Sequence, residues 1–519
     1  MTEAALVSSP ASSPGHAHRP ERAIERGTER PIRTAAIANL GCKVNQSEME
    51  GAARRLRSRG IAVVDARERA DLVLVNTCTV TMEADAKSRH AVRAARRASP
   101  DAEIVVTGCS VQVGREAFAA ADPAARLVDN RSKDALLAEL DALLGPDLAA
   151  AGARVPRALP TLSGVDPADA VGAVEAVHPG ASPIDGIADG RASVERTRAF
   201  VKVQDGCSFY CTYCIIPAAR GAERSLLPEV VLADVQAALA AGHREIVLTG
   251  INIGTYDGGR SERGFRGSHT RSALTLAGLV RRILDETDVE RIRISSIEPQ
   301  HVDDELIRVW SDGGPRTLPH VHLPLQSGDD GVLRRMGRRY RSAEYAAIVA
   351  RVREALPGVA MHADAIVGFP TEDDVAWGRS VDFIRSLDLA GLHVFRYSPR
   401  PGTAATRMTG QVDDATRKRR AAELLRLAAD ARARWAAAHP GREADVLLET
   451  RLADGRWMGH AVDHTLVAVP PLRAGDDLEN AIVHVAIDAV DAVVPDRTVG
   501  RILSLCPPRP AAGALAHAR

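Results

Sequence analysis

The chain has 519 residues, with 67 lysine and arginine residues against 67 aspartate and glutamate residues. Zero net charge excludes a protein that binds nucleic acid with its whole surface, so any such contact must use a local basic patch. No run of about 18 uncharged apolar residues occurs, and the first residues lack a signal-peptide pattern. We therefore expect a cytoplasmic protein that makes no membrane contact.

The seven cysteines lie at positions 42, 78, 109, 207, 211, 214 and 506. An odd number in a chain of this size argues against a disulfide scaffold and for a reducing compartment. Clustered cysteines in such a compartment commonly bind metal or take part in chemistry. The positions of these cysteines relative to the predicted strands therefore decide what they can bind.

A parallel α/β domain is predicted over residues 31–145, after a disordered tail at 1–30 that is rich in Ser, Pro and His. Its expected strands are 35–40, 71–76 and 103–107, and its expected helices are 48–59 and 84–98. The carboxyl ends of parallel strands share one edge of the sheet. Cys42, Cys78 and Cys109 each follow one of these strands within three residues, so we expect them to converge in space.

Residues 146–195 are rich in Ala, Pro and Gly and show weak periodicity, which predicts a linker or insertion. Strand–helix alternation resumes over 196–438 and is typical of a complete or partial parallel barrel. The expected strands are 199–203, 245–249, 291–295, 320–323, 363–367 and 391–395. The expected helices are 229–241, 274–286, 342–355 and 412–438.

The last part of the chain has a different composition. Residues 439–505 carry short β-like runs and turn signals, which predict a small all-β module such as a partly open barrel, and 506–519 is expected to be a loose tail. The overall fold class is therefore α/β with a C-terminal all-β module. Six arginines against eleven acidic residues make this module an unfavourable surface for phosphates.

The strongest local signal is the spacing C-x3-C-x2-C at Cys207, Cys211 and Cys214. Three thiolates this close can hold three corners of a cubane iron–sulfur cluster and leave its fourth iron open. An open iron can take a bidentate ligand such as the amino and carboxylate groups of S-adenosylmethionine. The alternatives are a zinc site, although a closed zinc site requires four ligands, and unpaired buried cysteines.

The trio Cys42, Cys78 and Cys109 is a weaker signal, because buried free cysteines at strand ends are common. Each is expected in a tight loop beside Gly or Thr residues. Backbone N–H groups in such loops can bond to sulfides and tune a cluster. The two interpretations have about equal weight from the residues alone.

Several motifs now carry a family resemblance over about residues 33–505. Besides C-x3-C-x2-C, they are LGCKVNQ at 40–46, NTCTVT at 76–81, VTGC at 106–109, RIRISSIEP at 291–299, HLPLQSG at 322–328, DAIVGFP at 364–370 and FRYSPRPGTAA at 395–405. The chain resembles the methylthiotransferase family of radical S-adenosylmethionine enzymes. LGCKVNQ and HVHLPLQSG look most like the branch that acts on N6-threonylcarbamoyladenosine in tRNA.

The resemblance implies two 4Fe–4S clusters and S-adenosylmethionine as cofactors. Cys207, Cys211 and Cys214 would bind the cluster that cleaves S-adenosylmethionine, and Cys42, Cys78 and Cys109 would bind an auxiliary cluster linked to sulfur donation. The implied reaction adds a methylthio group to carbon 2 of N6-threonylcarbamoyladenosine at tRNA position 37. The implied fold is a radical S-adenosylmethionine barrel followed by a TRAM-like module. The implied partners are a tRNA anticodon stem-loop, an electron donor such as flavodoxin or ferredoxin, and an unknown sulfur donor.

Polar and small residues near barrel strand ends are candidates for binding S-adenosylmethionine, because those ends face the active site of such a barrel. The candidates are Thr249, Gly250, Asn252, Ser295, Glu298, Gln326 and Gly368, with Glu298 and Gln326 favoured. Each polar candidate can equally be an ordinary helix cap or loop hydrogen bond.

Contact with RNA requires positive charge, and two arginine-rich segments at 87–97 and 334–341 can supply it. Such segments are more often solvated helix faces. Stacking by Arg456 or Trp457 of the C-terminal module is a further expectation. Three other functions stay open: the same chemistry on isopentenyladenosine in tRNA, the same chemistry on a ribosomal protein side chain, and a non-catalytic iron–sulfur or zinc protein that binds RNA.

Overall fold

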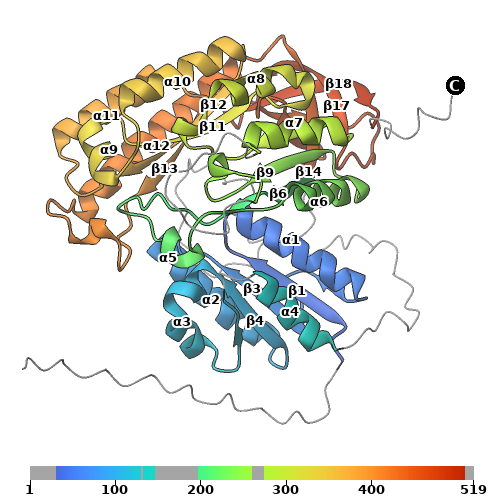
Figure 1. The fold of residues 1–519 in the computed structure, drawn as a ribbon. Helices are drawn as coiled ribbons and strands as arrows, with labels where there is room; N and C mark the ends of the chain where they lie inside the picture. The colour runs from blue at the N-terminus through green and yellow to red at the C-terminus, as the bar shows by residue number, and fades with distance from the viewer. Residues whose placement is uncertain (1–30, 130–132, 146–196, 260–273, 509–519) are drawn as a thin grey trace, which may run out of the picture.

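The computed structural model describes residues 31–129, 133–145, 197–259 and 274–508, and Figure 1 shows their arrangement. The predicted tail 1–30, the predicted linker 146–195 and most of the predicted tail 506–519 lie outside these ranges. The domain boundaries drawn from the sequence stay predictions. No helix in the described ranges is long and apolar enough to cross a membrane.

The N-terminal layer is a parallel sheet with strand order β2-β1-β3-β4-β5. Its strands are β1 (Thr34–Asn39), β2 (Ala62–Val64), β3 (Leu72–Thr77), β4 (Glu103–Gly108) and β5 (Arg126–Leu127). Its helices are α1 (Lys43–Ser58), α2 (Met82–Ala98), α3 (Cys109–Ala121) and α4 (Lys133–Leu144). Apolar residues of α1 and α4 pack on one face of the sheet, and those of α2 and α3 pack on the other. The sheet is therefore buried on both sides, as its strand pattern predicts.

The central layer has six parallel strands in two groups, with orders β10-β9-β6 and β11-β12-β13. They are β6 (Arg198–Lys202), β9 (Glu245–Thr249), β10 (Arg291–Ile294), β11 (His320–Gln326), β12 (Ala360–Val367) and β13 (Gly391–Arg396). The amide of Ile297 donates to His322 O at 3.0 Å and links the two groups. One continuous apolar core contains residues from all six strands. The arrangement is the predicted partial barrel.

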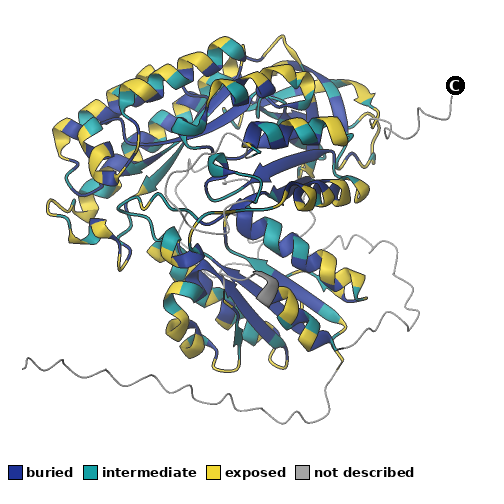
Figure 2. Cartoon of the chain, in the orientation of Figure 1, coloured by how far each residue is buried: buried dark blue, intermediate teal, exposed yellow. Residues whose placement is uncertain are grey.

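Helices cover the outside of this barrel and leave the strands buried (Figure 2). They are α6 (Pro228–Ala240), α7 (Leu276–Glu286), α8 (Asp304–Asp312), α9 (Asp330–Met336), α10 (Ser342–Ala355), α11 (Asp374–Ser386) and α12 (Asp414–Ala437). The N-terminal layer joins the barrel at its first edge strand, because α1 packs against β6. The long helix α12 packs against β13, the opposite edge strand.

The C-terminal module is a closed barrel with order β14-β15-β16-β18-β17, rather than the partly open barrel that the sequence suggested. Its strands are β14 (Glu443–Arg451), β15 (Trp457–Ala461), β16 (Leu466–Val469), β17 (Ile482–Val490) and β18 (Arg497–Cys506). Closure comes from the parallel pairing of β16 with β18, which no local sequence pattern specifies. The expectation that Trp457 stacks on RNA is wrong, because its ring is buried in this barrel core.

Candidate active site

Strand register brings Cys42, Cys78 and Cys109 to one edge of the N-terminal sheet. Asn39 of β1 is paired with Asn76 of β3, and Thr77 of β3 is paired with Gly108 of β4. Each cysteine follows one of these paired strand ends, and the Ser110 hydroxyl donates to Cys78 O at 2.7 Å. The predicted convergence is therefore present. One detail differs from the sequence reading: Cys109 is the first residue of α3 rather than part of a loop.

Glycine makes the close approach at this edge possible. Gly108 has φ of +105°, and a Cβ atom there would lie 2.4 Å from Thr77 O. Asn45 Nδ2 donates to the same Thr77 O at 3.2 Å and to Asn76 Oδ1 at 2.9 Å. The backbone that precedes Cys78 and Cys109 is thus held by a buried amide network that only glycine at position 108 accommodates.

The second trio lies in the loop between two short elements, β7 (Gln204–Asp205) and α5 (Ile216–Arg220). Gly206 precedes Cys207 with φ of +70°, and a Cβ atom there would lie 2.0 Å from Ala222 O. Thr212 clamps the middle of the loop to the end of α9, because its amide donates to Met336 O at 2.9 Å and its hydroxyl to Arg335 O at 2.8 Å. These contacts fix a loop that otherwise has little regular structure.

Burial raises the pKa of four of the six thiols, those of Cys78, Cys109, Cys207 and Cys214. It raises the pKa of Cys78 to about 12, of Cys207 to about 11 and of Cys214 to about 12. Charges on other cysteines of the same trio contribute to each of these three raised pKa values. Thiolates here therefore require cations that bind them directly.

The spacing of the sulfurs fits a cluster better than a single zinc ion. Two sulfurs on one zinc lie at most about 4.6 Å apart, since each Zn–S bond is about 2.3 Å. Among the residues that the structure describes, neither cysteine trio has all its sulfurs within 4.8 Å of one another. Three thiolates on separate irons of a cubane are spread more widely than ligands of one ion. The geometry therefore argues against the zinc alternative.

Arg220 links the two trios. Its side chain is fully buried, and its Nε donates to Cys109 Sγ at 3.2 Å. The guanidinium also bonds to Asp205 at 2.9 Å, to Glu48 at 3.0 Å and to Asn45 Oδ1 at 2.5 Å. Burial alone would raise the pKa of Asp205, but the charges of Arg220 and Lys202 hold this pKa below its usual value. A residue six positions after Cys214 thus contacts the other cysteine site.

A second arginine, Arg338, lies beside the C-x3-C-x2-C loop. Its Nη1 is 3.6 Å from Cys211 Sγ, its Nε donates to the Tyr340 hydroxyl at 3.1 Å, and its Nη2 forms an ion pair with Glu298. Arg338 belongs to the segment 334–341 that the sequence suggested for phosphate contact. Because Arg338 is buried and paired, this residue is not available to phosphate.

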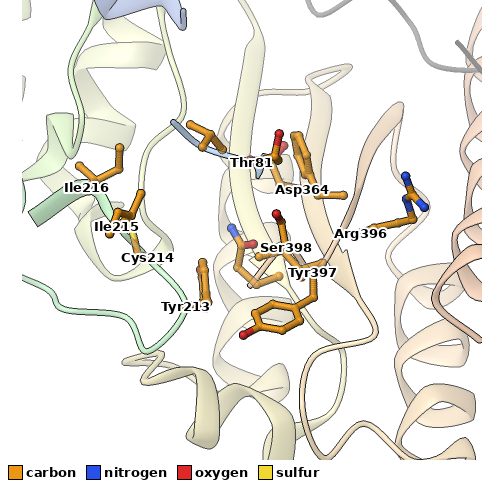
Figure 3. A pocket seen from close by; sticks show the side chains of 13 residues that line it. Thr81, Tyr213, Cys214, Ile215, Ile216, Asp364, Arg396, Tyr397 and Ser398 are labelled. Atoms are coloured by element: carbon orange, nitrogen blue, oxygen red, sulfur yellow. The ribbon is translucent and has the colours of Figure 1, made fainter. Parts of the chain in front are cut away.

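A cavity of about 250 Å³ lies between the two cysteine sites (Figure 3). Val80 and Thr81, which follow Cys78, line one wall, and Tyr213 and Cys214 line another. The remaining lining residues come from the strand ends of the barrel and from the segments beside them: Ile215, Ile216, Gln326, Asp364, Ile366, Phe395, Arg396, Tyr397 and Ser398. The cavity is therefore in contact with both cysteine loops at once.

Asp364 supplies a fixed negative charge in the cavity wall. Its Oδ1 is 2.8 Å from His322 Nε2 and 3.0 Å from His393 Nδ1. Burial would raise the pKa of Asp364, but the two histidines hold it far below its usual value. The carboxylate thus stays ionised and is oriented by both rings.

The residues predicted to bind S-adenosylmethionine differ in how close they lie to the cavity and to the C-x3-C-x2-C loop. Gln326 lines the cavity, and Asn252 Nδ2 is 3.9 Å from Cys207 Sγ. Thr249, Gly250 and Ser295 lie at or just after the carboxyl ends of β9 and β10, where Thr249 and Ser295 are buried and Gly250 lies beneath the side chain of Gln204.

Two other candidates have partners within the protein. Glu298 is paired with Arg338. Gly368 donates its amide to Glu372 at 2.6 Å and packs on Arg417, because a Cβ atom there would lie 2.1 Å from Arg417 Cγ. Of these two, Glu298 lies nearer the C-x3-C-x2-C loop, through Arg338.

Sequence reasoning did not single out Arg220, Arg338 or Arg400. Arg400 Nη2 donates to Thr79 Oγ1 at 2.5 Å and forms an ion pair with Asp85, so it joins the loop after β13 to the Cys78 loop. In a chain with 62 arginines, their composition gives no signal. Position gives a hint for two of them, since Arg220 lies six residues after Cys214 and Arg400 lies within FRYSPRPGTAA, whereas Arg338 lies in the arginine-rich segment 334–341.

Comparison with known proteins is consistent with this site. A family model described as "Uncharacterized protein family UPF0004" matches residues 34–129, and one described as "Radical SAM superfamily" matches residues 201–384. The second match defines a radical S-adenosylmethionine enzyme.

Individual relatives narrow the family. The chain is 36% identical to threonylcarbamoyladenosine tRNA methylthiotransferase MtaB of Bacillus subtilis, over 76% of this chain and 80% of the relative. It is 31% identical to the MtaB of Thermotoga maritima, over 90% of this chain and 100% of the relative. It is also 32% identical to tRNA-2-methylthio-N(6)-dimethylallyladenosine synthase of Maricaulis maris, over 80% of this chain and 86% of the relative. The chain belongs to the methylthiotransferase family of radical S-adenosylmethionine enzymes.

The bridge formed by Arg220 can be tested by stability. We expect Arg220→Leu to lower the free energy of unfolding by about 3–5 kcal/mol, because it leaves buried carboxylates without their main partner. The control is Arg54→Leu, whose half-exposed side chain lies 3.9 Å from Asp234 and should cost less than about 1 kcal/mol. Urea unfolding of both variants measures the difference. Equal losses would show that the buried network contributes no more than a surface pair.

Proposed function

We propose that this protein transfers a methylthio group to carbon 2 of N6-threonylcarbamoyladenosine at position 37 of tRNA. The observation that carries the proposal is the cavity that contacts both cysteine loops, because a substrate base held there would reach both sites. The names of the relatives with 36% and 31% identity support the same nucleoside. The substrate is a tRNA anticodon stem-loop.

Enzymes of this family carry two 4Fe–4S clusters and use S-adenosylmethionine. Cys207, Cys211 and Cys214 would hold one cluster, and Cys42, Cys78 and Cys109 would hold the other. When bound, the first supplies the electron for reductive cleavage of S-adenosylmethionine to a 5′-deoxyadenosyl radical, and the second is linked to sulfur donation. The arginines beside Cys109 and Cys211 are compatible with anionic groups at both places.

The protein's own residues position the reactants and exclude water. Asn252 and Gln326 are the best supported contacts for S-adenosylmethionine, because they lie beside Cys207 and in the cavity wall. Thr249, Gly250, Ser295, Glu298 and Gly368 stay proposals with less structural support. Tyr213, Ile215 and Phe395 give the cavity apolar walls, which protect a radical from solvent.

Arg396 favours a threonylcarbamoyl substrate over an isopentenyl one. Among the residues that line the cavity, Arg396 is the only cation and Asp364 is the only carboxylate. Arg396 lies 3.8 Å from Asp414, and its charge helps to lower the pKa of Glu83. Threonylcarbamoyladenosine ends in a carboxylate, whereas isopentenyladenosine ends in an apolar group. A cation at the cavity can pair with the carboxylate of threonylcarbamoyladenosine. The apolar end of isopentenyladenosine would leave that cation without a partner.

A reduced small protein such as flavodoxin or ferredoxin is the proposed electron donor, since reductive cleavage of S-adenosylmethionine consumes an electron. The cytoplasm is the proposed location, since the proposed substrate is tRNA. The second candidate function is the same chemistry on isopentenyladenosine, which the relative from Maricaulis maris supports at 32% identity.

Nucleoside analysis of tRNA from a deletion strain tests the substrate. We expect the methylthio derivative of threonylcarbamoyladenosine to disappear while its precursor accumulates. The gene returned on a plasmid should restore it. Loss of the isopentenyl derivative instead would support the second candidate, and unchanged tRNA would refute both.

Because the two cysteine trios have different proposed roles, variants in each trio should lose different activities. Each of Cys78→Ala and Cys207→Ala should lower iron from about eight to about four per chain after anaerobic reconstitution. Cys207→Ala should abolish cleavage of S-adenosylmethionine, whereas Cys78→Ala should retain cleavage to 5′-deoxyadenosine and lose methylthiolation. The control is Cys506→Ala, since Cys506 lies at the end of β18 beside Asp445 and should keep all iron. Methylthiolated product from the Cys78 variant would contradict this division.

The role of Arg396 can be measured by steady-state kinetics on modified tRNA. We expect Arg396→Gln to raise KM about 10- to 100-fold with little change in kcat, because a hydrogen bond to a charged group contributes about 1.5–3 kcal/mol. The matched control is Lys418→Gln, which removes the other cation beside Asp414 at 2.9 Å but does not line the cavity. If both variants behave alike, Arg396 does not select the substrate.

A further inference from the structure

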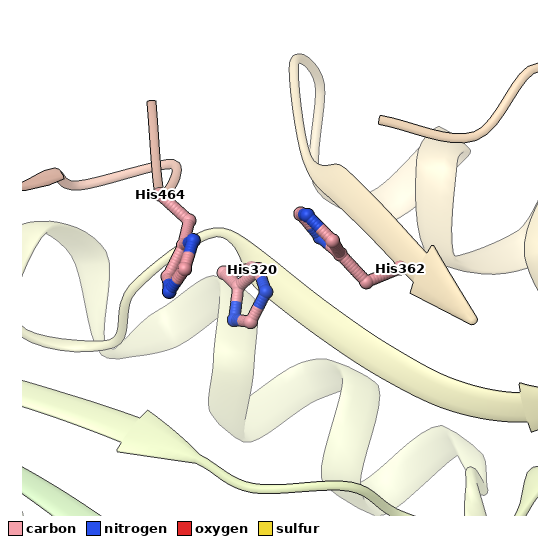
Figure 4. Close-up of side chains that lie close together, drawn as sticks. All are labelled: His320, His362 and His464. Carbon is pink, nitrogen blue, oxygen red and sulfur yellow. The ribbon is translucent and has the colours of Figure 1, made fainter. Parts of the chain in front are cut away.

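Three histidines meet at the end of the barrel opposite the cysteines (Figure 4). His320 is the first residue of β11, His362 lies near the start of β12, and His464 lies in the turn between β15 and β16 of the C-terminal barrel. One ring nitrogen from each lies within 4.8 Å of the other two. Two domains of the chain therefore place three imidazoles around one point.

We propose that His320, His362 and His464 bind one zinc ion that fastens the C-terminal barrel to the base of the central barrel. Imidazole nitrogen is a preferred ligand of zinc, at about 2.0–2.1 Å. Three such nitrogens around one tetrahedral ion lie about 3.3–3.4 Å apart, so the rings would have to close by at most about 1.5 Å in separation. Three protein ligands leave the fourth position for a small ligand.

The local structure agrees with a ligand at this point. His320 is only 5% exposed, and its Nδ1 has no hydrogen-bond partner among the described residues. A buried polar atom without a partner is unfavourable, and coordination would supply the partner. His464 has φ of +71°, a backbone conformation that is uncommon for a residue other than glycine. The turn therefore holds the His464 ring against His320, at 4.4 Å between ring centroids.

The charge state of the rings is compatible with coordination. Burial, followed by neighbouring histidines and Arg293, holds the pKa of His320 and of His464 well below the usual value. Both rings are therefore neutral, which is the form that binds a metal. The geometry of the three rings carries the proposal, and this neutrality removes one objection to it.

Arg293 is the main electrostatic obstacle, because its charge reaches His320 and His464. Glu245 offsets part of this charge, since it accepts from Arg293 Nε at 2.9 Å and lies 2.9 Å from Arg291 Nε. The two terminal nitrogens of Arg293 are buried without a hydrogen-bond partner in the described structure. A hydroxide or chloride ion as the fourth zinc ligand would lower the net charge and give these nitrogens an acceptor. We therefore expect zinc to bind together with an anion.

The position of the site indicates an anchoring role. The same interface has an ion pair between Arg198 and Glu449 at 3.4 Å and a hydrogen bond from Asn480 Nδ2 to Gly242 O at 2.7 Å. Arg291 Nη2 also donates to His460 O at 3.3 Å, and Arg244 Nη2 donates to Cys506 O at 3.1 Å. A shared metal would add coordination bonds to these polar contacts between the two barrels. The inference does not depend on the proposed substrate.

The experiment uses the full chain, reconstituted anaerobically with iron and sulfide, incubated with Zn²⁺ and then desalted. We expect about one zinc ion per chain in addition to iron. The X-ray absorption spectrum at the zinc edge should show only nitrogen or oxygen neighbours near 2.0–2.1 Å. Absence of zinc would overturn the proposal. Sulfur neighbours near 2.3 Å would also overturn it, because they would place the zinc on cysteines.

Two variants test the ligands. His464→Asn and His362→Asn should each weaken Zn²⁺ binding at least 10-fold while iron content is unchanged, and asparagine tolerates the backbone at position 464. The control is His243→Asn, since His243 is bonded to Thr197 O at 3.2 Å and lies outside the three-histidine group. Full zinc binding by both test variants would contradict the assignment. The absorption spectrum of the unmodified protein decides the question even if a variant fails to fold.

Discussion

The buried guanidinium of Arg220 is the interaction on which the arrangement of the two cysteine sites depends. Arg220 ends the short helix that follows Cys214, yet it contacts Cys109, Asn45 and Glu48 of the N-terminal layer. A charge with no exposure to solvent is tolerated only where it is paired and hydrogen-bonded on all sides. The two layers therefore have to meet in one orientation, and that orientation brings the cavity between both trios.

Arg400 reinforces the same constraint from the other side of the cavity. It reaches from the loop after β13 to Thr79 and Asp85, and Asp85 also lies beside the Ser110 hydroxyl of α3. The Cys78 loop is thus held between α3 and the last barrel strand. An enzyme that must keep a radical and a sulfur donor in register needs this rigidity more than it needs catalytic side chains.

The sequence predicts the elements well where one pattern is sufficient. The boundaries of β9 at Glu245–Thr249 and of α10 at Ser342–Ala355 agree with the prediction to the residue. Strand β9 contains a short continuous apolar run, and α10 has Tyr345, Val349 and Val352 buried at helical spacing. Helix α1 begins at Lys43, five residues before its expected start, because its first turn buries the polar residues Asn45 and Gln46. Polar residues that are buried by tertiary contacts carry no local hydrophobic signal.

The same distinction between local patterns and tertiary contacts applies to the candidate site. The cysteines were identifiable because their spacing and their positions after strands have a chemical meaning. Closure of the C-terminal barrel and the burial of Arg338 and Trp457 were not identifiable, because each depends on a partner far away in the chain. Arg338 is paired with Glu298, 40 residues earlier, so a segment that looks basic in the sequence is partly neutralised in the structure.

The two ends of the central barrel hold different charged residues. Their pairing inside the protein is consistent with the zero net charge of the whole chain. The carboxyl ends of the strands hold cysteines with buried arginines beside them, since thiolates and sulfides need positive partners. The amino ends hold Arg291 and Arg293, both paired with Glu245, and Arg198, which pairs with Glu449 of the acidic C-terminal barrel. Many arginines are therefore paired with carboxylates inside the protein rather than exposed to solvent. Arg456 of the C-terminal barrel is also paired, with Asp454 and Asp491, whereas Arg334, Arg335 and Arg339 of the segment 334–341 and Arg396 at the cavity stay exposed and can contact phosphates.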